Sequence, residues 1–162
     1  MGQTPLLLHR ASHRDKVSAA AALMLSPVAG HVRLLYQTFP NTHVDAELYS
    51  FFLRQLLRAV RGQVVLVHDR GNMHRGPLIR ELQADFARLH LHDFPPYAPE
   101  LNPVEYLWNW CKHKRLCNFA AHNLTELENA ACECLDDAGH DQHRLRSFFW
   151  SSPLSWSGTG LM

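Results

Sequence analysis

The sequence contains no long hydrophobic run and no surplus of one charge. None of its apolar stretches approaches the roughly 18 residues that a membrane-spanning helix needs. Its first residues lack the basic and then apolar order of a secretory signal. We therefore expect a cytoplasmic protein with no membrane partner. Sixteen Lys and Arg against fifteen Asp and Glu give a net charge of +1, so charge alone does not indicate a nucleic-acid-binding protein.

Cysteine pairs with the spacing of a zinc site are also lacking. The four cysteines include no CxxC pair, and without a secretory signal we expect free thiols. Cys111, His113 and Cys117 share one helical stretch, so a structural zinc site is the alternative, which this spacing disfavours. Apolar residues, in contrast, make up 46% of the 162 residues. That is enough for one domain with one hydrophobic core.

The hydrophobic pattern predicts a hairpin and then an alternation of helices and strands. Apolar runs predict strands at residues 17–25, 32–39, 63–68 and 89–94. Apolar residues at three-to-four spacing predict helices at 45–60, 76–88, 103–116 and 123–138, the last ended by Gly139. We expect residues 1–150 to form one α/β domain, a mixed sheet flanked by helices whose strand–helix part is parallel. Residues 151–162 are expected to be a loosely ordered tail.

Two carboxylates stand where such a sheet places its ligands. Asp69 follows the strand at 63–68, whose β-branched run is typical of an interior strand. Glu105 lies in the first turn of the helix after the next strand. Because parallel neighbours end at the same edge of a sheet, both side chains are expected there. Mg²⁺ takes oxygen ligands, and two such ions about 4 Å apart activate a water or a sugar hydroxyl in phosphodiester chemistry.

An ordinary structural role for both acids is the alternative. An Asp directly after a strand is commonly a turn residue, and a Glu in a first helical turn complements the helix dipole. The positions of Asp69 and Glu105 alone leave both interpretations open.

The sequence around these acids resembles one family. HDRGNMH at 68–74 and PPYAPELNPVEYLWNWCK at 95–112 resemble the DDE transposase catalytic domain of the mariner-type superfamily, in its bacterial insertion-sequence branch. GQTP at 2–5 and FFLRQLLRAVRG at 51–62 extend the likeness over most of the chain. Asp69 matches the second acid of the family and Glu105 the third. The framing positions also match: His74, Tyr97, Pro99, Leu101, Asn102, Pro103, Trp108 and Lys112.

The resemblance implies an RNase H-like fold and DNA strand cleavage and joining with two Mg²⁺ or Mn²⁺ ions held by three acids. In the family, the first acid comes from the central strand, just before the GQTP segment. Met1 directly precedes that segment here, so we expect an N-terminally truncated domain that lacks its central strand and first acid. Two strand edges would then be unpaired. The PLLLH segment at 5–9 is a partial replacement for that strand, and a partner is the other way to cover the edges.

The resemblance also implies DNA as the partner, both transposon ends and target. Lys112, His113, Lys114 and Arg115 form a basic cluster after Glu105 that can contact phosphates; a solvated helix end is the alternative. His74 can touch metal-bound water or DNA, or hold its loop by a hydrogen bond. A homo-oligomer or a transposase segment encoded upstream is a further expected partner.

Three functional hypotheses remain open at this point. The first is a transposase domain whose missing part is supplied by a separate upstream segment, in the cytoplasm of a bacterium and on its nucleoid when bound to DNA. The second is a catalytically inactive remnant that at most binds DNA or intact transposase. The third, an RNase H-like nuclease unrelated to transposition, is disfavoured because the 95–112 block is so particular to transposases.

Overall fold

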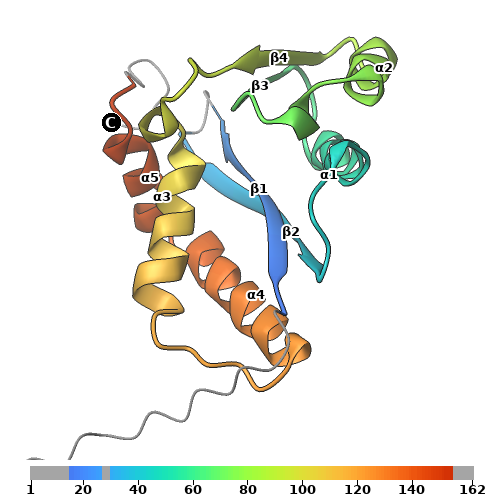
Figure 1. The fold of residues 1–162 in the computed structure, drawn as a ribbon. Helices are drawn as coiled ribbons and strands as arrows, with labels where there is room; N and C mark the ends of the chain where they lie inside the picture. Colours follow the sequence, from blue (N-terminus) through green and yellow to red (C-terminus); the bar gives the residue numbers. More distant parts are fainter. Residues whose placement is uncertain (1–14, 27–29, 155–162) are drawn as a thin grey trace, which may run out of the picture.

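An antiparallel hairpin forms the middle of the molecule. The computed structural model of the chain describes residues 15–26 and 30–154. Strand β1 (Val17–Leu25) pairs with β2 (Val32–Pro40) along its whole length. The predicted hairpin is therefore confirmed. Figure 1 shows helices α3, α4 and α5 on one side of this hairpin and α1 on the other.

A second pair of strands lies beyond the hairpin, at the top of Figure 1. β3 (Val64–His68) pairs in parallel with β4 (Leu89–Asp93), as the sequence predicts. The hairpin and the parallel pair remain two separate two-stranded sheets. Among the described residues, no strand joins β1 to β3.

Helices α1 (Ala46–Ala59) and α2 (Pro77–Asp85) cover the parallel pair. Asp45 caps α1, because its Oδ1 accepts from the amides of Glu47 and Leu48 at 3.1 and 2.9 Å. Helix α1 buries Tyr49, Phe52, Leu53, Leu56 and Leu57. Phe51 of the same helix is 46% exposed. Helix α2 ends at Asp85 instead of residue 88, since the chain turns there and the Leu89 amide donates to the Phe86 carbonyl.

The proline-rich segment and the helix after it follow the predicted plan with one exception. A 3₁₀ turn at Pro99–Leu101 leads to α3 (Pro103–Trp110), capped by the Asn102 side chain. The last predicted turn of this helix is a π-helical turn, Cys111–Arg115, in which the Leu116 amide donates to the Cys111 carbonyl at 2.8 Å. Such widened turns occur frequently at functional sites.

The C-terminal helices differ most from the prediction. Helix α4 (Leu124–His140) starts as expected, with the Asn123 side chain accepting from the Glu126 amide at 2.9 Å. Gly139 does not end it but lies in its last turn. The chain passes directly into α5 (Gln142–Ser151), a helix that the sequence did not predict and that Asp141 caps through the Arg144 amide at 3.0 Å.

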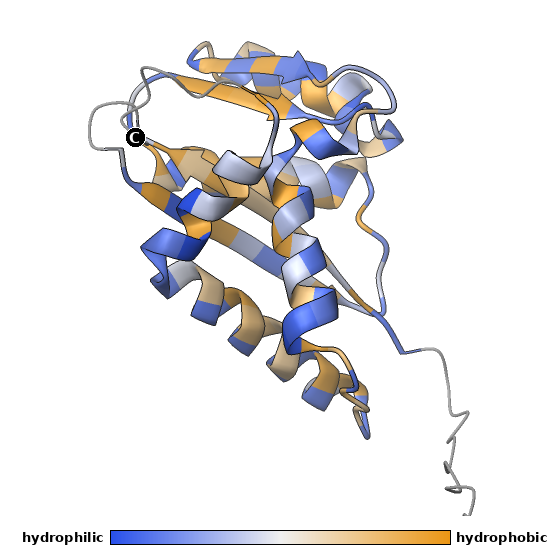
Figure 2. Ribbon diagram, turned by 90° about the vertical axis from the view of Figure 1, so that its left-hand side faces the viewer, coloured by the Kyte–Doolittle hydropathy of each residue, from blue (hydrophilic) through white to orange (hydrophobic). Residues whose placement is uncertain are grey.

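Two hydrophobic cores lie on the two faces of β1. Ala20, Ala22 and Met24 face the first core, formed with α1, α2, β3 and β4. Ala21 and Leu23 face the second, formed with β2, α3, α4 and α5. Figure 2 shows hydrophobic residues gathered on the strands and on the helix faces turned toward them. Strand β2 likewise contributes Leu35 to the first core and Val32 to the second, so the hairpin joins the two cores.

Some expectations fall outside the described residues. These are the GQTP segment at 2–5, the PLLLH segment at 5–9 and the tail from residue 155 to 162. Within the described ranges, no helix is long and apolar enough to cross a membrane.

Candidate active site

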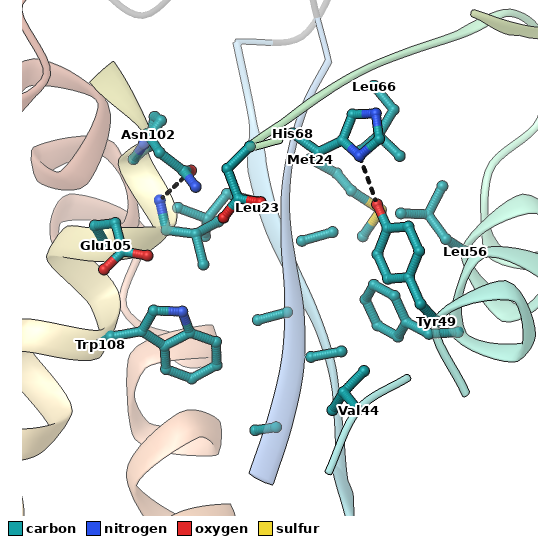
Figure 3. Close-up of a pocket in the computed structure, with 18 of the residues that line it drawn as sticks. Leu23, Met24, Val44, Tyr49, Leu56, Leu66, His68, Asn102, Glu105 and Trp108 are labelled. Carbon is teal, nitrogen blue, oxygen red and sulfur yellow. Dashed lines mark hydrogen bonds between the residues drawn. The ribbon is translucent and has the colours of Figure 1, made fainter. Parts of the chain in front are cut away.

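Asp69 and Glu105 line the same cavity. This cavity has a volume of about 850 Å³ and lies between the hairpin and the parallel strand pair, against β1 and β3. We call it the inter-sheet cavity. Figure 3 shows Glu105 and Trp108 of α3 on one side of β1, and Tyr49 and Leu56 of α1 on the other. The structure thus brings together the two acids that the sequence singles out.

Two contacts hold one carboxylate oxygen of Asp69, while the side chain stays accessible. Its Oδ1 accepts from the Gly71 amide at 2.8 Å and from His74 Nε2 at 2.9 Å, and the Asp69 side chain is 60% exposed. A methyl group at position 71 would lie 2.9 Å from Asp69 Oδ1 and 3.1 Å from His74 Cδ2. A side chain at position 71 would therefore displace the Asp69 carboxylate or the His74 ring. These contacts fix one carboxylate oxygen and leave the other for a ligand.

His74 belongs to a packed group of rings behind Asp69. Its ring meets Tyr49 edge-on at 4.2 Å and His68 at 4.7 Å between centroids, and Tyr49 Oη lies 3.4 Å from His68 Nδ1. Burial lowers the pKa of His74 to about 4 despite the opposing charge of Asp69, and burial also lowers the pKa of His68. Both imidazoles are therefore neutral near pH 7, and His74 Nε2–H donates to Asp69.

A further acid, at the end of the strand next to β3, is already paired. Asp93, at the end of β4, lies 3.3 Å from Arg75, 3.6 Å from Arg70 and 3.6 Å from His68. Two guanidinium groups thus compensate its charge. Asp93 fixes the loop after β3 rather than offering a free carboxylate.

Glu105 is positioned by the ordered proline-rich loop. Asn102 Oδ1 accepts from the Val104 amide at 3.1 Å and starts the helix that carries Glu105. The buried Ser152 donates its hydroxyl to the Leu101 carbonyl at 2.9 Å, which ties this loop to the end of α5. In the part of the chain that the structure describes, no side-chain hydrogen bond or ion pair occupies the Glu105 carboxylate. Its oxygens are therefore free for a ligand.

The basic cluster divides into two parts. Arg115 pairs with Asp137 and lies over the ring of Trp110 at 5.9 Å, so it serves the packing of α3 against α4. Lys112, His113 and Lys114 are exposed on the π-helical turn. Lys112 also lines the inter-sheet cavity together with Glu105.

The donors fit a hard divalent cation, although they are few. Two carboxylates on one cavity offer the oxygen ligands that Mg²⁺ and Mn²⁺ prefer. Across residues 15–26 and 30–154, no group of three or more His, Cys, Asp or Glu side chains is arranged to hold a metal ion. The described residues thus bring two carboxylates to the inter-sheet cavity.

Comparison with known proteins identifies the family. Residues 1–128 match the family of DDE superfamily endonucleases. The chain belongs to this family. No curated protein matches the chain. Among solved structures, this DDE superfamily endonuclease is similar to the Mos1 transposase catalytic domain, in a structure with raltegravir and Mg. The two share 14% sequence identity and a TM-score of 0.51, and the match covers 87% of this chain and 85% of that one. The fold is therefore RNase H-like.

The sequence named some residues around the inter-sheet cavity and missed others. Asp69 and Glu105 were named from local patterns. The Tyr49–His68 contact and the Ser152 tie were not, because each joins residues far apart in the chain. The available signal for His68 was a histidine at the end of an otherwise apolar strand.

Proposed function

We propose that this DDE superfamily endonuclease is a transposase catalytic domain that cleaves and joins DNA strands by a two-metal mechanism. Asp69 and Glu105 would hold the ions together with a first acid that the described residues do not supply. The observation that carries the proposal is that these two carboxylates, 36 positions apart in the sequence, line one cavity with free oxygens. The similarity to a transposase catalytic domain supports it.

The residues of this chain would have distinct roles in that reaction. Bound divalent ions would supply activation of a water or sugar hydroxyl and stabilisation of the departing oxygen. His74 and the Gly71 amide orient Asp69 by their contacts to Oδ1. The loop tied by Ser152 fixes the start of α3 and with it Glu105. Preformed positions of this kind lower the free energy needed to assemble a metal site.

Transposon-end and target DNA would approach from the α3 side. Lys112, His113 and Lys114 are exposed next to the cavity, where they can contact phosphates. Tyr97 is fully exposed in the loop before α3 and has a φ of 58°, in the left-handed region. Residues held in such conformations concentrate at functional sites. We propose the cytoplasm of a bacterium, with its nucleoid, as the place where the protein meets DNA.

Divalent-metal binding tests the proposal. Mn²⁺ binding to the whole chain is measured by titration, with electron paramagnetic resonance of the free ion as readout. We expect Asp69→Asn and Glu105→Gln each to weaken binding about tenfold or more. Glu81→Gln, an exposed acid on α2, is the matched control and should bind like the wild type. Equal Mn²⁺ binding by all four proteins would show that Asp69 and Glu105 are not metal ligands.

The count of carboxylates favours a second candidate function. Because the described residues bring two acids to the cavity, a remnant that binds DNA or intact transposase without cleaving it is the alternative. Nicking of a supercoiled plasmid in Mg²⁺ separates the two. Metal-dependent nicking that Asp69→Asn abolishes supports the transposase. DNA binding without nicking, while Mn²⁺ still binds, supports the remnant.

A further inference from the structure

Two arginines in the loop after β3 converge on one carboxylate oxygen. Arg70 directly follows Asp69, and Arg75 directly follows the 3₁₀ turn Asn72–His74. Arg70 Nε lies 3.6 Å and Arg75 Nη2 lies 3.3 Å from the same atom, Asp93 Oδ2. We call these two side chains the arginine pair. The loop that carries Asp69 therefore also brings two guanidinium groups to one point.

The arginine pair keeps most of its hydrogen-bonding capacity. Each guanidinium group carries five N–H donors, and Asp93 engages one nitrogen of each. The side chains of Arg70 and Arg75 are 48% and 55% exposed. Ion pairs at such exposed positions contribute little to the stability of a fold. Stability therefore gives little reason for holding two arginines at this point.

The charge at the arginine pair is not balanced. Two guanidinium groups face the single carboxylate of Asp93, and the buried His68, 3.6 Å from its other oxygen, adds no negative charge. In contrast, Arg54 on α1 meets Asp85 one to one, at 3.3 Å. The arginine pair can therefore hold a further anion, whereas the Arg54–Asp85 pair is already neutral.

We propose that Arg70 and Arg75 together bind one phosphate of the DNA strand that reaches the candidate active site on the side of Asp69. A guanidinium group suits this ligand because it donates two parallel hydrogen bonds to phosphate oxygens. The exposed lysines of the π-helical turn follow the other acid-bearing element, α3. The inference rests on the proposed function, and it adds phosphate contacts beside the second of the two carboxylates.

Asp93 makes this phosphate contact preformed. Long side chains lose rotamer freedom when they bind a ligand, which weakens binding. Asp93 already orients Arg70 and Arg75 in the structure without DNA. Because the remaining N–H groups are free for the phosphate, neither arginine has to leave Asp93 when DNA binds.

DNA-binding titrations of the whole chain test this inference. Anisotropy of a fluorescently labelled duplex is measured in EDTA at KCl concentrations from about 50 to 200 mM, because each neutralised phosphate adds about 0.9 to the salt slope of the binding constant. We expect the double variant Arg70→Gln, Arg75→Gln to bind more weakly and to lose about 0.9 of that slope. Arg54→Gln, which removes an arginine from the other exposed Arg–Asp pair, is the matched control and should keep the slope.

Lysine variants separate the phosphate contact from a purely structural role. Arg70→Lys together with Arg75→Lys keeps both charges, so the salt slope should stay close to that of the wild type. A role limited to fixing the loop predicts a lower melting temperature for the glutamine variant and an unchanged slope. Arg75→Gln alone should lose part of the slope, and it covers the case in which the double variant does not fold.

Either of two results would overturn the inference. In one, the glutamine variants and Arg54→Gln have equal slopes. In the other, the wild type does not bind the duplex at about 50 mM KCl. Because EDTA removes divalent ions, these titrations do not depend on Asp69 and Glu105 as metal ligands. Loss of the slope effect with intact Mn²⁺ binding contradicts the arginine pair alone, and the reverse result contradicts the metal site alone.

Discussion

Asp69 keeps its position through His74, and removing that ring is the most direct residue-scale test of the site. His74→Ala deletes the hydrogen bond to Asp69 Oδ1 and the ring that packs against Tyr49 and His68. Partners that orient a metal ligand typically change metal affinity by about 10–100-fold. We therefore expect weaker Mn²⁺ binding in titrations of His74→Ala, with His113→Ala, an exposed histidine on the π-helical turn, unchanged. Unchanged Mn²⁺ binding in His74→Ala would show that Gly71 alone suffices to hold Asp69.

A second residue-scale prediction concerns the pH dependence of stability. The Arg144 amide, which donates to Asp141, lowers the pKa of this carboxyl, and the nearby Arg144 charge adds to the effect. A folded-state pKa below the unfolded value, about 3.9, means that the cap stabilises the fold above that pH. Its contribution is lost as the pH falls through the folded pKa.

We therefore expect Asp141→Ala to lower the melting temperature at pH 7, and the difference from the wild type to shrink below about pH 5. Asp141→Asn keeps a capping oxygen and removes the titrating group. It should therefore lower the melting temperature less than Asp141→Ala does. Thermal unfolding between pH 7 and about pH 2 measures all three. A constant difference over this range would contradict a stabilising carboxylate.

At the scale of elements, α5 is an integral part of the fold rather than a tail. It supplies Leu145, which is fully buried, together with Phe148 and Phe149 to the second core. Leu145→Ala should destabilise the protein by about 2–5 kcal/mol, the usual range for a buried Leu. His143→Ala, an exposed position on the same helix, should stay within about 0.5 kcal/mol. Urea unfolding measures both, and equal midpoints would show that α5 does not contribute to the cooperative fold.

The boundary between α4 and α5 is less evident in the sequence than the starts of the other helices. Other helix starts are indicated by their capping residues, Asp45, Asn102 and Asn123, because a cap and the helix it starts are contiguous in the chain. Asp141 is a cap of the same kind, but Gly139 two residues earlier suggested an end. Packing of α4 against β2 keeps the helix regular through Gly139. A Cβ atom added at Gly139 would lie 3.9 Å from the Leu34 side chain. The local sequence around Gly139 does not reveal this contact with a distant strand.

At the scale of the whole molecule, the β1–β2 hairpin contributes residues to both hydrophobic cores. Leu56 lies in the first core and Leu135 in the second, each 2% exposed. Because β1 contributes one face to each, we expect a single cooperative unfolding transition. Leu56→Ala and Leu135→Ala should each lower the free energy of unfolding by about 2–5 kcal/mol. The double variant should be additive within about 0.5 kcal/mol.

Circular dichroism for the helices and tryptophan fluorescence for the second core follow this transition together. Coincident curves are expected for the wild type and both single variants. Two separate steps, each moved by only one variant, would mean that the cores unfold independently and that β1 does not couple them.

The sequence by itself determined the family, the hairpin, the parallel pair and the two carboxylates. Each rests on a local signal: the apolar run of β3 ends at Asp69, and the proline-rich block sets the start of α3 and hence Glu105. Only the tertiary structure decided that both acids line one cavity, that His74, His68 and Tyr49 support Asp69, and that α5 completes the second core. These features join residues from distant elements, and their energies come from packing and burial, which a local pattern does not encode.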